Sequence, residues 1–230
     1  MTTAAPPKPA VVSRDAVPLA RLAATEGIAT AFLLIAVVGS GIMAERLCAG
    51  NLGLALLANA IATGGALVAL ILAFAASSGA HMNPAVTIWA ALSGRLDWRA
   101  VPAYVPAQIS GAIAGVWLAH AMFDLPILQL GTHVRTGGGQ WLGEVIATFG
   151  LIAVVRACRE PRDAAIAVGA YITGAYWFTS STSFANPAVT IARALSDSFA
   201  GIRPADAPGF ILAQCVGVLL ALALLPRRDA

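Results

Sequence analysis

The chain has few charged residues and few cysteines, and both observations limit the class of protein to which it can belong. Only 11% of its 230 residues are charged, whereas a soluble globular domain has roughly 25%. With 59% hydrophobic residues, this composition indicates a polytopic membrane protein. Its three cysteines have no CxxC spacing, which disfavours a disulfide framework or a metal site. The net charge of +3 comes without a dense basic run, so nucleic-acid binding is not expected.

Charge-free runs predict where the chain crosses the membrane. The run over residues 47–94 is more than twice the roughly 20 residues that one crossing needs, so it must hold a full helix and a shorter one. The run over 164–192 requires the same division. We expect full helices over about 27–44, 52–75, 100–123, 140–157, 163–180 and 207–226.

The two shorter segments carry the same six residues. Residues 81–92 read HMNPAVTIWAAL and residues 184–195 read FANPAVTIARAL. Asn is a strong helix N-cap, and Pro suits the first helical position because its missing N–H would have no intrahelical partner. Each copy therefore predicts a helix that begins abruptly in apolar surroundings. Two helix N-termini inside a membrane protein, with their free donors and partial positive charge, predict a functional polar site.

The two halves of the chain repeat each other. Glu26 opens EGIATAFLLIAVV and Glu144 opens EVIATFGLIAVV. Each half has three full helices and one half-helix, so the second half must be inverted in the membrane. We predict an all-α membrane protein with six transmembrane helices and two re-entrant half-helices. Its channel domain covers 18–226, with repeats at about 18–124 and 138–226, and a disordered tail, 1–17, without a cleavable signal precedes it.

The distribution of Lys and Arg predicts the orientation. With both termini in the cytoplasm, ten basic residues lie inside and four outside, and a cytoplasmic excess is the expected bias. The inner set is Lys8, Arg14, Arg21, Arg95, Arg99, Arg156, Arg159, Arg162, Arg227 and Arg228, and the outer set is Arg46, Arg135, Arg193 and Arg203. The chain is accordingly expected to be a multi-pass protein of the cell (inner) membrane.

These features together resemble the aquaporin, or major intrinsic protein, family. The resemblance covers about residues 18–226, and its most specific motif is SGAHMNPAVT at 78–87. Most members have Arg directly after the second NPA, where this chain has Val189. The stretch STSFANPAVTIARALSDSFAGI at 181–202 resembles the bacterial aquaglyceroporin branch associated with arsenic resistance.

The resemblance implies an hourglass fold with one pore per subunit, a homotetramer, and no cofactor or metal. The two NPA boxes would meet tip to tip at the pore centre, and each Asn would cap its own helix and offer N–H to a passing solute. The pore residues are then Asn83, Pro84, Ala85, Asn186, Pro187 and Ala188. Without the resemblance, the same boxes could be two ordinary capped helices in a bundle.

The resemblance also places a selectivity filter one turn outward from the second NPA box. Its residues would be Gly174, Ser183, Val189 and either Gly65 or Thr63. None is large or charged, whereas water-selective relatives have an aromatic residue, a His and an Arg there. We therefore expect a wide filter that passes neutral solutes larger than water, such as glycerol, arsenite or methylated arsenicals. Alternatively, nearby aromatic residues close the gap and leave a water-selective pore; these are Tyr176, Trp177, Phe178 and Phe184.

Four further residues have two interpretations each or a supporting role. Arg193 lies one turn beyond Val189, and we favour an ion pair with Asp197 over a position in the outer vestibule. Glu26 and Glu144 are expected to hold the NPA loops rather than to relay protons, and His81 to make a structural hydrogen bond.

Three functional classes remain in competition at this point. A passive channel for small neutral solutes in the lipid bilayer is favoured. A proton-coupled transporter would need a titrating group in the pathway, which the sequence does not place there. An enzyme is not expected, because no nucleophile–base pair or pair of catalytic carboxylates is apparent.

Overall fold

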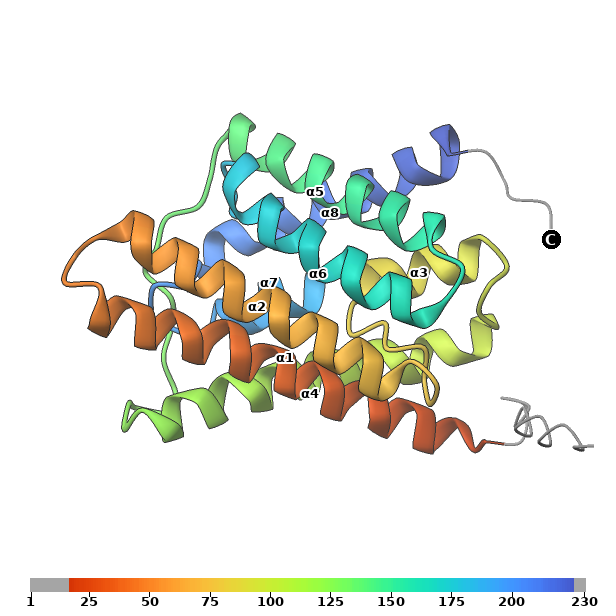
Figure 1. Cartoon of the computed structure of the whole chain (residues 1–230), viewed down its shortest axis with the longest axis horizontal. Helices are drawn as coiled ribbons and strands as arrows, with labels where there is room; N and C mark the ends of the chain where they lie inside the picture. The colour runs from red at the N-terminus through yellow and green to blue at the C-terminus, as the bar shows by residue number, and fades with distance from the viewer. Residues whose placement is uncertain (1–16, 226–230) are drawn as a thin grey trace, which may run out of the picture.

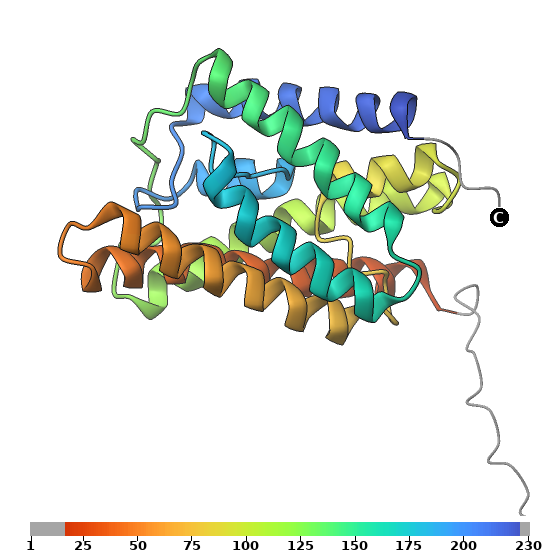
Figure 2. The ribbon, with the colours of Figure 1, turned by 45° about the horizontal axis from the view of Figure 1, so that its top comes forward.

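The computed structural model describes residues 17–225 and is entirely helical over that range. Six long helices are inclined to one another along the molecule (Figures 1 and 2). They are α1 (Leu19–Leu47), α2 (Leu52–Phe74), α4 (Val101–Met122), α5 (Gly138–Ala157), α6 (Pro161–Phe178) and α8 (Ala207–Leu224). The short helices are α3 (Pro84–Leu92) and α7 (Pro187–Arg193), with 3-10 turns η2 (Trp98–Ala100) and η3 (Pro204–Asp206).

The observed helices follow the predicted spans, with shifted ends. Helix α1 starts at Leu19 rather than near 27, because the helix continues through the charged residues Arg21 and Glu26 that precede its apolar part. Helix α6 starts two residues early, at Pro161, whose fixed φ suits the first turn. Five of the helices are long and apolar enough to cross a bilayer, whereas α6 has the length, 18 residues, but begins with charged residues. Apart from Val17, the predicted tail over 1–17 lies outside the described residues.

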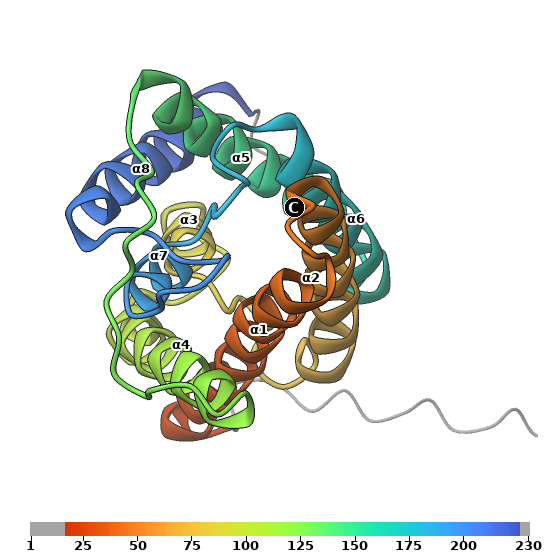
Figure 3. The same ribbon diagram turned by 90° about the vertical axis from the view of Figure 1, so that its left-hand side faces the viewer.

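The six long helices form an incomplete ring, which the two short helices complete between α4 and α8 (Figure 3). Helix α1 packs on α2 and α4, α5 packs on α6 and α8, and α2 packs on α6 to join the halves. The end-on view in Figure 3 shows α3 and α7 between α4 and α8, and both short helices pack on these two long helices. The first long helix begins, and the last one ends, at the same end of the bundle (Figure 1). We call this end the inner end and the opposite end the outer end.

Glycines allow the long helices to cross closely. A Cβ added to Gly64 of α2 would lie 2.8 Å from the carbonyl oxygen of Gly169 in α6, and one added to Gly169 would lie 2.7 Å from that of Gly64. A Cβ on Gly111 of α4 would lie 2.8 Å from the carbonyl carbon of Gly27 in α1. Such crossings are typical of membrane helices, whose association depends on close packing rather than on the hydrophobic effect.

Candidate functional site

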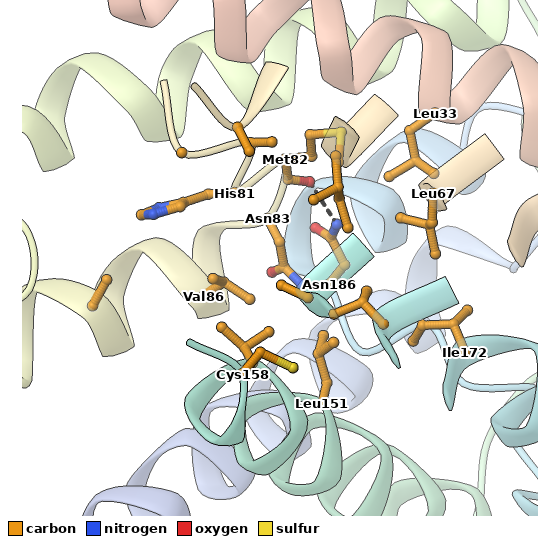
Figure 4. Close-up of a pocket in the computed structure, with 18 of the residues that line it drawn as sticks. Leu33, Leu67, His81, Met82, Asn83, Val86, Leu151, Cys158, Ile172 and Asn186 are labelled. Carbon is orange, nitrogen blue, oxygen red and sulfur yellow. Dashed lines mark hydrogen bonds between the residues drawn. The ribbon is translucent and has the colours of Figure 1, made fainter. Parts of the chain in front are cut away.

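The two NPA boxes meet at the centre of the molecule and hold each other. The side chain of Asn83 donates from Nδ2 to the carbonyl oxygen of Ala185 at 2.8 Å. The side chain of Asn186 donates to the carbonyl oxygen of Met82 at 2.8 Å, as Figure 4 shows. Each Asn also caps its own helix, because Oδ1 accepts from the N–H two residues on. This reciprocal contact is more than two separately capped helices would make. It also leaves each amide a second N–H for a solute.

The loops that lead to the boxes have an unusual backbone. Ala80 and Met82 precede the first box with φ of 50° and 49°, and Ser183 and Ala185 precede the second with φ of 50° and 49°. Residues with a Cβ are disfavoured in this left-handed region by about 1–2 kcal/mol each. The same conformation in both loops must therefore be fixed by contacts from outside them.

Two buried carboxylates supply those contacts. Glu26 accepts from the backbone N–H groups of His81 at 2.9 Å and Met82 at 2.7 Å. Glu144 accepts from Phe184 and Ala185, both at 2.8 Å. Both carboxylates are completely buried and neither lines the cavity described below. This arrangement matches the interpretation of Glu26 and Glu144 as anchors of the loops.

One glutamine completes each anchor, and the interpretation of the sequence missed both of these residues. Gln108 Nε2 donates to Glu26 at 2.8 Å and to Thr87 Oγ1 at 3.0 Å. Gln214 Nε2 donates to Glu144 at 2.6 Å and to Thr190 at 2.9 Å. A signal was present, because both glutamines belong to a repeated AQxxG pattern at 107–111 and 213–217.

A cavity of about 340 Å³ runs beside the paired asparagines, Asn83 and Asn186, which line it. Its inner end is lined by Arg95, Cys158, Arg159 and Glu160, and its outer end by Tyr176, Ser183, Phe184, Val189 and Arg193. Aliphatic side chains form the wall between them, including Leu33, Leu67, Leu151 and Ile172 (Figure 4). The cavity is thus apolar on one side and offers asparagine N–H groups on the other, as a path for small uncharged molecules requires.

Only some of the predicted filter residues line the cavity. Val189 and Ser183 line the cavity. Thr63 is buried, and its hydroxyl lies 3.3 Å from that of Tyr176, which lines the cavity. Gly174 is half-buried and does not line it. Gly65 is exposed, and an added Cβ there would meet nothing within 4 Å. Neither Thr63 nor Gly65 lines the cavity, so the fourth filter position stays a prediction.

Two of the four aromatic residues that could close the filter point elsewhere. Trp177 and Phe178 of α6 are 51% and 58% exposed, and neither lines the cavity. Tyr176 and Phe184 are buried and line the cavity. The aromatic alternative is therefore reduced to these two side chains.

The favoured ion pair between Arg193 and Asp197 is wrong. Asp197 instead accepts from the N–H and hydroxyl of Thr132, at 3.2 and 2.7 Å. Arg193 is 2% exposed, lines the cavity, and places its guanidinium carbon 3.5 Å from the ring centroid of Phe184. The pairing rule for residues four apart assumes a continuous helix, and α7 ends at Arg193.

Two other polar residues differ in their relation to the cavity. His81 lines the cavity, and its Nδ1 lies 3.1 Å from the hydroxyl of Thr87, which matches the expected structural hydrogen bond. Arg135, in the loop before α5, lies beside Phe184 at 5.3 Å but does not line the cavity. Burial lowers the pKa of the Arg135 guanidinium below its ordinary value. No group of three or more potential metal ligands occurs among residues 17–225.

The fold and the site define a membrane channel in which two half-helices meet at the middle of one pathway. Comparison with known proteins agrees: residues 14–165 match the family model of the major intrinsic proteins. The chain is 55% identical over 209 residues to aquaglyceroporin AqpS of Rhizobium meliloti (strain 1021), covering 90% of this chain and 89% of that protein. The chain belongs to the major intrinsic protein family, whose members are passive channels and not enzymes.

More distant relatives extend the comparison. Aquaporin NIP1-4 of Oryza sativa subsp. japonica is 34% identical over 186 residues, covering 75% of this chain and 65% of that protein. The X-ray structure of the aquaglyceroporin from Plasmodium falciparum superposes with a TM-score of 0.67 at 22% identity, covering 90% of this chain and 95% of that one. At this identity the likeness shows a shared fold.

Proposed function

We propose that this chain is a passive channel for water and for neutral solutes of about the size of glycerol. The observation that carries the proposal is the continuous cavity past Asn83 and Asn186, with an aliphatic wall opposite their amides. The relationship to aquaglyceroporin AqpS supports the same solute size. Undissociated arsenite and methylated arsenicals are neutral oxygen-bearing molecules of this class, so we include them among the proposed solutes.

The proposed width of the outer end of the cavity depends on residue 189. Val189 lines the outer end of the cavity where most family members have Arg, and its neighbour Ser183 is also small. A branched aliphatic side chain at this position leaves room that a guanidinium would fill. A water-selective pore is the second candidate, and it is favoured by Tyr176 and Phe184, which line the same end.

Proton coupling is the less favoured mechanism, because the two buried carboxylates face the loops. Glu26 and Glu144 are held by hydrogen bonds from backbone N–H groups and from Gln108 and Gln214. A carboxylate held in this way has no room to take a proton from the pathway and pass it on. We infer that flux follows the solute gradient alone.

The orientation and assembly are also part of the proposal. We infer that both termini lie in the cytoplasm and that the chain is in the inner membrane, because ten of fourteen basic residues then lie on the cytoplasmic side. Helix α3 would enter from the cytoplasm and α7 from outside. A homotetramer is proposed from the family resemblance.

Permeability of the purified protein in lipid vesicles tests the function. Stopped-flow light scattering would measure the permeability of the vesicles to water, to glycerol and to trivalent arsenic acid, each with and without a proton gradient. We expect faster flux of all three solutes than in empty vesicles, with no effect of the gradient. Water flux alone would support the second candidate, and flux that rises with the gradient would support coupled transport.

A further inference from the structure

The outer end of the cavity contains a buried guanidinium without a counter-ion. Arg193 is 2% exposed, and no carboxylate lies within ion-pair distance of it in the described residues. Its charge is stabilised by the face of Phe184, 3.5 Å away, and by the carbonyl oxygen of Ala200, which accepts from Nε. Buried charges are normally paired because desolvation is costly. An unpaired arginine beside a pathway therefore requires an explanation.

The position of Arg193 is set by the short helix that starts at the second NPA box. Val189 and Arg193 are four residues apart in α7, so they lie on the same face, and both line the cavity. Four residues advance a helix by roughly 6 Å. The guanidinium is thus one turn further out than the position at which most family members have their arginine.

Two sets of polar atoms at this end lack partners. The terminal nitrogens of Arg193, Nη1 and Nη2, make no hydrogen bond within residues 17–225, although Nε does. Ser183 is 3% exposed and lines the cavity, and its hydroxyl has no hydrogen-bond partner in the described part of the chain. A donor fork and a hydroxyl group, both without partners at one end of the cavity, point to a ligand that has oxygen atoms.

We propose that Arg193 is the specificity-determining residue of the outer end, and that it carries the fixed positive charge and the donor fork that Val189 lacks. The proposal rests on the channel function proposed above. The charge excludes cations and protons from the pathway, while Val189 keeps the pore wide. The planar fork favours two oxygen atoms close together, so it selects neutral solutes with vicinal hydroxyl groups, and the Ser183 hydroxyl provides a further contact.

The substitution Arg193→Gln tests this role while keeping the structural contact. The side-chain nitrogen of Gln lies as many bonds from the backbone as Nε of Arg, so it can still donate to the Ala200 carbonyl. The charge and the fork are lost. Arg135→Gln is the matched control, because Arg135 stacks on the same ring and donates from Nε to the Gly201 carbonyl, at 2.8 Å, but does not line the cavity.

Two measurements on the reconstituted variants separate the role in selectivity from a structural one. The first is proton leak under a potassium diffusion potential, followed with an entrapped pH dye. The second is the permeability ratio of 1,2-propanediol to 1,3-propanediol, which are isomers of equal size. We expect Arg193→Gln to raise the leak at least about tenfold, as the loss of a unit charge near the path would. We also expect it to bring the diol ratio close to one, because an open pore without the fork no longer distinguishes isomers of equal size. Arg135→Gln should change neither.

A folded Arg193→Gln protein with wild-type water flux, proton leak and diol ratio would overturn the proposal. If this variant does not fold, Ser183→Cys in the presence of Arg193 gives a second measurement. A positive field at this end should make an anionic methanethiosulfonate reagent react faster, relative to a cationic one, than it does with a free thiol. An equal ratio would overturn the proposal. Failure of the wild type to pass glycerol would refute the proposed solute class but would leave the proton-leak comparison valid.

Discussion

The carboxylate of Glu144 should be required to hold the second NPA loop in its left-handed conformation. Its Oε1 accepts from Phe184, and its Oε2 accepts from Ala185 and from Gln214. In Glu144→Gln the side-chain NH₂ must replace one oxygen and then faces a donor. Even the better orientation leaves the Phe184 N–H without an acceptor and weakens the other two bonds. An unsatisfied buried donor costs about 1–3 kcal/mol, so we expect a total loss of about 2–4 kcal/mol.

Thermal unfolding in detergent and water flux in vesicles measure this effect. A loss of that size corresponds to a fall in Tm of about 5–15 °C for a chain of this length. Glu45→Gln is the control, because its exposed carboxylate accepts one long bond, 3.2 Å, from the Phe199 N–H and should shift Tm little. Equal Tm and equal flux for Glu144→Gln and the wild type would refute the claim that this carboxylate holds the loop.

Two other predictions concern the helix crossings and the inner end of the cavity. Gly111→Val should destabilise the protein by about 2 kcal/mol or more, because its Cβ would meet the backbone of Gly27, whereas Gly65→Val should be neutral in the same unfolding assay. Equal stability of the two variants would contradict the close crossing of α1 and α4. Cys158 lines the cavity, so Hg²⁺ should slow water flux in the wild type and in Cys215→Ser, but not in Cys158→Ser. Inhibition of Cys158→Ser would place the reactive thiol elsewhere.

The local chemistry of the NPA boxes was predictable from the sequence. An Asn cap followed by Pro fixes the start of a helix wherever the chain lies, so α3 and α7 begin at Pro84 and Pro187 as expected. The number and order of the long helices also followed, because a stretch of about 20 apolar residues is a strong signal.

Other contacts between distant segments were missed when the sequence was interpreted. Gln108 and Gln214 bind carboxylates that are 82 and 70 residues away in the chain. The prediction of Asp197 as the partner of Arg193 was wrong, because the sequence does not show that α7 ends at Arg193. The sequence also could not choose between Thr63 and Gly65, because it does not show the rotation of α2, which buries Thr63 and exposes Gly65.

The role of residue 189 in solute size selection can be measured as the glycerol-to-water permeability ratio of the wild type and of Val189→Arg. We propose that the cavity passes glycerol-sized solutes because residue 189 is small and apolar. We therefore expect glycerol flux well above that of empty vesicles in the wild type and a fall of at least about tenfold in the variant, a change worth about 1.4 kcal/mol, while water flux persists. A wild type that excludes glycerol, or a variant that passes it equally well, would contradict the account.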